Sequence, residues 1–113
     1  IIGVEHLLPA FPLGAVGSSS SSGAIAPNFC RRFYAALVAN DWETARACQY
    51  KVSRLWRLFK EQYPSSLKGA MIMMGRPVGP TRSPLPTANK ERLDYLRREL
   101  EELNILQTEP HGW

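Results

Sequence analysis

The sequence is poor in the residues from which self-contained catalytic and metal sites are built. It has two histidines and two cysteines, and Cys30 and Cys48 show neither C-x-x-C spacing nor the nearby histidine cluster of a zinc site. A Ser-His-Asp triad would rest on His6 alone, because His111 lies near the end of the chain. No phosphate-binding loop, G-x-G-x-x-G, H-E-x-x-H or G-x-S-x-G pattern occurs. The residues therefore predict no metal centre, no cofactor and no catalytic constellation that is complete within this chain.

Long hydrophobic runs are also missing. No stretch approaches the ~18 consecutive apolar residues of a membrane helix. The apolar leader, residues 1–14, has no basic start and contains Glu5 and His6, unlike a signal peptide. Both cysteines fall in helical patterns, which is typical of small buried hydrophobes in a reducing compartment. The sequence thus predicts a cytoplasmic protein with no membrane partner.

A strong excess of one charge is absent too. The net charge is +4, from 14 basic and 10 acidic residues. Basic residues do cluster between Arg46 and Lys60, as a phosphate-binding helix would require. A solvated helix face has the same composition and is far commoner, and no nucleic-acid-binding signature accompanies the cluster. We therefore expect no nucleic-acid partner.

What is present fits one small domain. The chain has 113 residues, of which 44% are hydrophobic and 21% charged, close to the averages of globular proteins. A chain of this size can bury enough surface for a core. A complete (β/α)₈ barrel needs ~200–250 residues and does not fit.

The first 23 residues are apolar, punctuated by glycine, and end in a serine run. Residues 3–11 predict a loop and a short helix, which Pro9 and Pro12 keep from growing long. Residues 13–17 predict a short buried strand. Residues 18–22 are all serine. Their composition indicates a flexible linker, whereas their position between a strand and a helix start is typical of a loop that binds an anionic or polyhydroxy ligand, and both interpretations stay open.

From Pro27 the pattern becomes helical. Pro27 suits a first helical turn, Asp41 can cap a second helix, and Pro64 ends that second helix. Both helices have an apolar stripe at three- and four-residue steps. The stripes are Phe29, Phe33, Ala36 and Leu37 in the first helix, and Ala45, Cys48, Val52, Leu55, Trp56, Phe59 and Tyr63 in the second.

The last third of the chain predicts two more helices. Residues 65–74 form a short helix, and Thr87 caps a final one whose apolar stripe is spaced three, four and three residues apart. Between them, residues 76–86 contain four prolines and form an extended connector. Residues 107–113 are expected to be a frayed polar tail. The stripe of the final helix is Leu93, Leu96, Leu100 and Leu103.

Taken in chain order, six short motifs resemble one family, the dihydrodipicolinate synthase and N-acetylneuraminate lyase family of Schiff-base aldolases. They match the loop after the seventh barrel strand, the eighth strand, the start of the eighth helix, and three segments of the C-terminal helices. The motifs are Gly3-Val4-Glu5-His6, Leu13-Gly14-Ala15-Val16-Gly17-Ser18, Ala26-Pro27-Asn28, Ala39-Asn40-Asp41-Trp42 with Ala45-Arg46, Leu67-Lys68-Gly69-Ala70, and Gly79-Pro80-Thr81-Arg82-Ser83-Pro84-Leu85.

The resemblance implies an α/β fold class for the parent protein and a mostly α-helical fold for this chain. Residues 1–39 would be the C-terminal end of a TIM (β/α)₈ barrel, with its last strand and helix. Residues 40–106 would be a C-terminal helical bundle, and residues 107–113 a tail. The implied parent is a homo-oligomer, either a dimer or a tetramer.

The resemblance also implies a mechanism. A barrel lysine of the family forms an imine with pyruvate or a related 2-oxo acid, and that imine lets a neighbouring C–C bond form or break. The family places this lysine before Ile1, and Lys68 matches a helical lysine outside the barrel. This chain therefore has no expected catalytic residue, and we expect it to be inactive alone. The alternative is a non-catalytic helical module that binds another protein.

Four residues are expected at the substrate side. By resemblance to the lyase branch, Glu5 and His6 lie where acidic side chains contact substrate hydroxyls. Ser18, with Gly17 before it, lies where a strand-end serine does the same. His6 departs from the acidic residue of the family, so the resemblance leaves the preference for a sugar acid open.

Overall fold

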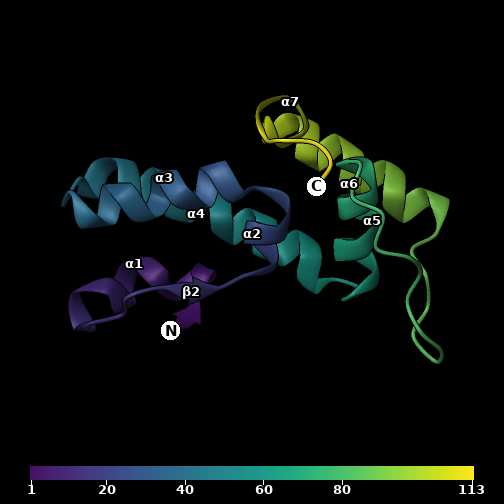
Figure 1. Ribbon diagram of the computed structural model, residues 1–113, viewed down its shortest axis with the longest axis horizontal. Helices are drawn as coiled ribbons and strands as arrows, with labels where there is room; N and C mark the ends of the chain where they lie inside the picture. Colours follow the sequence, from purple (N-terminus) through teal and green to yellow (C-terminus); the bar gives the residue numbers. More distant parts are fainter. The chain divides into compact units, whose positions relative to one another are not determined.

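The computed structural model describes all residues from 1 to 113, and most of them are helical (Figure 1). The chain forms two compact units, Ile1–Trp56 and Arg57–Trp113. Each unit is described below by itself. No helix has the length and apolar character needed to cross a membrane.

A short parallel strand pair organises the start of the first unit. Strand β1 (Ile2–Gly3) pairs in parallel with β2 (Ser18–Ser19), so that Ile2 lies opposite Ser18 and Gly3 opposite Ser19. The backbone N–H of Ile2 also donates to the carbonyl of Gly17 at 3.2 Å. Parallel strands need a crossover between them. Here it consists of the 3₁₀ turn η1 (Val4–His6), helix α1 (Leu7–Ala10) and the 3₁₀ turn η2 (Phe11–Leu13).

The loop and short helix expected in residues 3–11 are confirmed, but the buried strand predicted at residues 13–17 is wrong. Leu13 ends η2, and Gly14 reverses the chain at φ 93°, a left-handed conformation that suits glycine. Leu13 and Val16 are 88% and 75% exposed. The ladder starts only at the carbonyl of Gly17, because that is where β1 offers its first partner.

The serine run is a structured junction, so the flexible-linker interpretation is wrong. Two serines form β2, and Ser20 caps helix α2 (Ser21–Ile25) by accepting a hydrogen bond from the N–H of Gly23 at 3.2 Å. Serine at this position satisfies a donor that the first helical turn leaves unpaired. Ser22 is buried, and its hydroxyl has no hydrogen-bond partner.

Helices α3 (Pro27–Val38) and α4 (Trp42–Lys60) follow the predicted stripes. All four stripe residues of α3 are buried, and so are most of those of α4. The exceptions are Trp56, which is half-buried, and Tyr63, which lies beyond the end of α4 at Lys60 and is 59% exposed. Burial raises the pKa of the Cys48 thiol, more than nearby cations lower it, so Cys48 packs as the predicted neutral hydrophobe.

The turn between α3 and α4 contains the predicted break and cap. Asn40 adopts a left-handed conformation with φ 56°. The Asp41 carboxylate accepts a hydrogen bond from the N–H of Thr44 at 3.1 Å. Hydrogen bonding from the Thr44 side chain, and then from this backbone N–H, lowers the pKa of Asp41. The two helices are also in contact through a cation–π pair. The Lys51 ammonium of α4 lies 4.9 Å from the ring centre of Phe29 in α3.

The second unit is built around helices α5 (Ser65–Met73), α6 (Lys90–Glu102) and α7 (Ile105–Thr108). Asn89, not Thr87, caps α6, because its side chain accepts from the N–H of Arg92 at 2.9 Å. Helices α5 and α6 meet at Gly69, where an added Cβ would lie 2.6 Å from the Leu93 side chain. An alanine at this position would force the Leu93 side chain to shift.

A buried arginine joins three segments of the second unit. Arg92 on α6 is 8% exposed and donates to the backbone carbonyls of Leu58 and Glu61, to the Glu61 carboxylate at 2.8 Å and to the Ser66 hydroxyl at 2.9 Å. Its guanidinium also lies over the Tyr95 ring. The end of α4, the start of α5 and α6 are thus held by one side chain, which the helical pattern did not reveal.

The frayed tail predicted at residues 107–113 is also wrong. Helix α7 reaches Thr108, and Glu109 is 6% exposed. Arg76, itself 5% exposed, donates to the carbonyls of Pro110 and Gly112, and the N–H of Gly112 donates to the carbonyl of Met74. The tail is ordered because these backbone groups have partners that lie far away in sequence.

Replacement of Arg92 should destabilise the second unit strongly. Arg92→Met removes the hydrogen-bond donor to the Leu58 carbonyl, the Ser66 hydroxyl and the Glu61 carboxylate. We expect a loss of about 2–4 kcal/mol in the free energy of unfolding. Arg98→Met removes an exposed arginine from the same helix and should change that free energy by less than about 0.5 kcal/mol. Urea denaturation followed by circular dichroism tests both, and equal effects would contradict the role given to Arg92.

The capping carboxylate should make the first unit sensitive to acid. The pKa of Asp41 lies below its ordinary 3.8 in the folded state, so its contribution is present above that value and is lost as the pH falls through the folded pKa. Asp41→Asn keeps a capping oxygen without the charge. The variant should therefore lose less thermal stability than the wild type between about pH 5 and about pH 2. An unchanged pH dependence would count against this cap.

Candidate functional site

The carboxyl ends of β1 and β2 form one edge of the strand pair. The strands are parallel and in register, so η1, which follows β1, and Ser20, which follows β2, leave the pair on the same side. In parallel α/β folds this edge is where ligands bind and where catalytic residues gather. The structure therefore identifies it as the candidate site.

Glu5 and His6 lie together at this edge. The Glu5 carboxylate folds back over Gly3, so that a Cβ at Gly3 would stand 2.4 Å from Glu5 Oε1. The His6 Nε2 lies 4.0 Å from the same oxygen, and the side chains are 18% exposed for Glu5 and 65% for His6. A shielded carboxylate beside an accessible imidazole offers a ligand both acceptors and a donor.

Gly17 and Ser18 lie on the neighbouring segment, but further from the carboxyl end. Ser18 is exposed and pairs with Ile2, the first residue of β1. Gly17 stands just before β2, and a Cβ there would meet nothing within 4 Å. Ser19 and Ser20 are closer to the edge along the strand, although the Ser20 hydroxyl already accepts the capping hydrogen bond. The structure thus joins Glu5 with His6 and places Ser18 on the adjacent strand.

Gln49 is a site residue that the sequence did not reveal. From α4, its side-chain amide donates to the carbonyl of Glu5 at 2.8 Å and accepts from the N–H of Leu8 at 3.1 Å. The available signal was a polar residue one helical turn after the buried Ala45, at the border of the apolar stripe. Such a residue is usually solvated, so the spacing alone could not show that it faces η1.

Three of the four lysines, Lys51, Lys68 and Lys90, are engaged in structural contacts. Lys68 donates to the carbonyls of Val78 and Pro80, both at 3.1 Å, so it holds the connector against α5. Lys90 pairs with Asp94 at 2.6 Å on α6. Lys51 lies over Phe29. None of these ammonium groups has the unpaired, desolvated setting that activates a lysine as a nucleophile.

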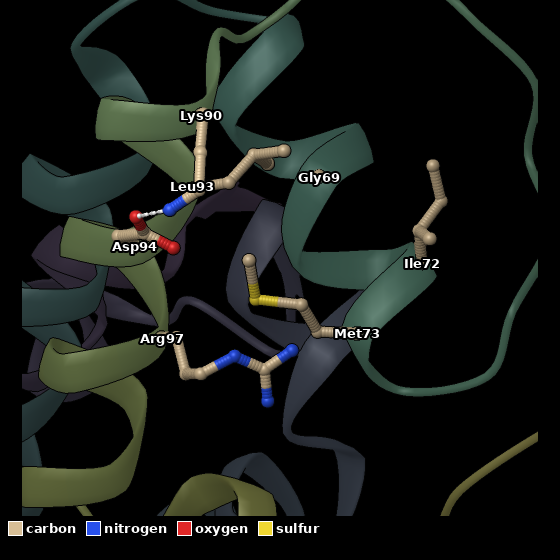
Figure 2. Close-up of a pocket in the computed structure, with 7 residues that line it drawn as sticks. All are labelled: Gly69, Ile72, Met73, Lys90, Leu93, Asp94 and Arg97. Carbon is tan, nitrogen blue, oxygen red and sulfur yellow. Dashed lines mark hydrogen bonds and ion pairs between the residues drawn. The ribbon is translucent and has the colours of Figure 1, made fainter.

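A groove of about 540 Å³ runs between α5 and α6 within the second unit (Figure 2). Its floor is apolar, and the Lys90–Asp94 ion pair lies at its rim. Figure 2 shows the Arg97 guanidinium reaching toward Met73. No serine, cysteine or histidine lines the groove, and its lysine is paired with Asp94. The lining residues are Gly69, Ile72, Met73, Lys90, Leu93, Asp94 and Arg97.

Comparisons with known proteins agree on one family. The chain matches the model of the Dihydrodipicolinate synthetase family over residues 3–103. The 4-hydroxy-tetrahydrodipicolinate synthase of Methanopyrus kandleri is 37% identical over 106 residues, which are 92% of this chain and 35% of that protein. The enzyme of the same description from Methanospirillum hungatei is 35% identical over 102 residues, covering 88% of this chain and 35% of its own length.

Solved structures show the same relationship. A dihydrodipicolinate synthase structure superposes with a TM-score of 0.79 at 32% identity, over 91% of this chain and 36% of that one. A Pseudomonas aeruginosa protein assigned as a dihydrodipicolinate synthetase gives 0.81 at 31% identity, over 88% of this chain and 35% of that one.

The chain thus spans about 35% of the length of the curated relatives it matches. The parallel strand pair followed by helices corresponds to the end of a (β/α)₈ barrel with its C-terminal helical bundle, as the motifs had indicated. The chain belongs to the dihydrodipicolinate synthetase family.

Proposed function

We propose that this chain is the C-terminal portion of a Schiff-base aldolase or lyase that joins pyruvate, or a related 2-oxo acid, to an aldehyde. The observation that carries the proposal is the shared carboxyl edge of β1 and β2, with Glu5 and His6 on it. An edge of this kind is where a barrel enzyme contacts its substrate. Family membership supports the imine chemistry.

In this proposal the chain supplies the aldehyde side of the site, not the nucleophile. The Glu5 carboxylate accepts hydrogen bonds from hydroxyl or ammonium groups of the aldehyde, and Ser18 adds a hydroxyl from the next strand. His6 donates through its imidazole, where the family has an acidic residue, and so favours an aldehyde that carries a negative charge or acceptor oxygens. The imine lysine belongs to the part of the parent protein that precedes Ile1.

The names of the relatives suggest which aldehyde to try. A tetrahydrodipicolinate has seven carbons, two carboxylates and one ring nitrogen. Removal of the three carbons of pyruvate leaves a four-carbon amino acid with an aldehyde, that is, aspartate semialdehyde. Its carboxylate would suit a histidine better than a second acidic residue would.

The proposal also includes the setting of the parent enzyme. It would act in the cytoplasm, in line with two cysteines that form no disulfide, and as a homo-oligomer.

A helical module that binds another protein remains the second candidate, and the groove between α5 and α6 is the observation in its favour.

Borohydride trapping tests the proposal. The full-length protein and this chain alone are each treated with pyruvate and borohydride, which reduces any imine to a stable amine. Both samples are then digested and mapped by mass spectrometry. We expect a pyruvate adduct on a lysine that precedes Ile1, where the family resemblance places the imine lysine. We expect none on the isolated chain, in which Lys51, Lys68 and Lys90 are held in structural contacts. An adduct on Lys51, Lys60, Lys68 or Lys90, or no adduct on either protein, would contradict it.

The acceptor is then found by offering aspartate semialdehyde, D-glyceraldehyde and N-acetylmannosamine to the full-length protein with pyruvate. Consumption of at least one of them is expected. Consumption of none would leave the protein-binding module as the better account of this chain.

Substitution of Gly3 should disturb the aldehyde side alone. The Cβ of Gly3→Ala would displace the flexible Glu5 carboxylate rather than the backbone, so the fold should persist. We expect KM for the aldehyde to rise about tenfold, with the rate of imine formation from pyruvate changed less than about twofold.

Gly23→Ala is the matched control. A Cβ there would meet only the Ser20 Cβ, at an ordinary 3.9 Å, within α2. Its kinetics should equal those of the wild type. If Gly3→Ala behaves like this control, the Glu5 carboxylate does not contact the aldehyde.

A further inference from the structure

We propose that Gln49 is a positioning residue, which orients η1 so that Glu5 and His6 face the aldehyde. The inference rests on the proposed function and concerns the same site. It arises from α4, an element that carries none of the residues expected at the strand edge.

The Gln49 side chain satisfies two backbone groups that α1 cannot satisfy itself. Leu8 lies in the first turn of α1, whose N–H groups have no partner within the helix, and the residue before that helix provides no side-chain cap. The Gln49 Oε1 accepts from the Leu8 N–H at 3.1 Å, and its Nε2 donates to the Glu5 carbonyl at 2.8 Å. One amide therefore spans the junction between η1 and α1.

A third hydrogen bond fixes the amide itself. The Gln49 Nε2 also donates to the Ser53 hydroxyl at 3.1 Å, one helical turn further along α4. Both amide protons and the amide oxygen are thus used. Only a side chain with two donors and an acceptor at this length makes all three bonds, so neither glutamate nor leucine can replace it.

The segment formed by η1 and α1 depends on Gln49 because its own internal hydrogen bonds are few. Helix α1 is four residues long, too short to be stable by its internal hydrogen bonds. At one end η1 is joined to β1, where Gly3 leaves room for the Glu5 carboxylate. At the other end Gln49 holds the Glu5 carbonyl. The direction of the Glu5 side chain therefore follows from where Gln49 holds its backbone.

The test uses the full-length protein, pyruvate, and whichever aldehyde of the panel above the wild type consumes fastest. Gln49→Leu and Gln49→Glu should each raise KM for that aldehyde about tenfold, while imine formation from pyruvate changes less than about twofold. Ser53→Ala keeps the Gln49 bonds to Glu5 and Leu8 and should change KM less than about twofold. Gln107→Leu, at an exposed glutamine of α7, is the matched control and should equal the wild type.

A double-mutant cycle separates positioning from a merely structural role. If Gln49 acts through Glu5, Gln49→Leu should change KM less than about twofold in a Glu5→Gln background. If Gln49 is merely structural, its substitution and that of Glu5 should have additive effects on the aldehyde KM, and imine formation should slow as well. If Gln49→Leu does not fold, Gln49→Glu, which keeps the bond from Leu8, carries the same cycle.

Three results would overturn the inference and leave the proposed function standing. They are an unchanged aldehyde KM in both Gln49 variants, additive effects of the Gln49 and Glu5 substitutions on that KM, and equal effects on aldehyde KM and on imine formation. A wild-type protein that forms no pyruvate adduct would overturn the proposed function, and this inference with it.

Discussion

A parallel ladder of two residues on each strand brings together segments that are fifteen or more positions apart in the sequence. Ile2 and Gly3 lie opposite Ser18 and Ser19, and the geometry of parallel pairing then forces η1 and the start of α2 to leave from the same edge. So short a ladder contributes little stability. Its register is maintained by what surrounds it, namely the crossover through α1 and the contact of Gln49 with that crossover.

Both units are stabilised by the same kind of interaction. In each, a polar side chain satisfies backbone groups of a segment distant in the sequence. Gln49 does so for η1 and α1, Arg92 for the end of α4, and Arg76, in the connector after α5, for the C-terminal residues. Buried carbonyls and N–H groups are costly without partners. The apolar stripes explain why the helices pack, and these polar contacts explain why the irregular segments between them have one conformation.

The helices could be predicted from the sequence because their signals are local. The stripes of α3 and α6, the break at Asn40 and the cap at Asp41 depend on residues within one or two turns. The predictions of a strand at residues 13–17 and of a frayed tail were wrong because the conformation of these segments is not determined locally. Whether Leu13 is buried, or the tail is ordered, depends on partners distant in the sequence, and an apolar or polar composition does not identify them.

The candidate site was predictable only through the family motifs. No spacing rule links Glu5 with Ser18, and the motifs did so because the parallel pair of a barrel links them. Gln49 stayed hidden because it acts through hydrogen bonds to the backbone. Gly3 belongs to a family motif, but its role, to leave room for the Glu5 carboxylate, could not be predicted from the motif. The groove between α5 and α6 was hidden as well, because it depends on how closely Gly69 lets the helices approach.

The most direct test is a crystal structure of the full-length protein after borohydride reduction with pyruvate and the aldehyde it consumes. The account predicts a covalent adduct whose aldehyde-derived end lies within hydrogen-bonding distance of the Glu5 carboxylate or the Ser18 hydroxyl, at the carboxyl edge of β1 and β2. An adduct bound elsewhere, with both side chains facing solvent, would contradict it.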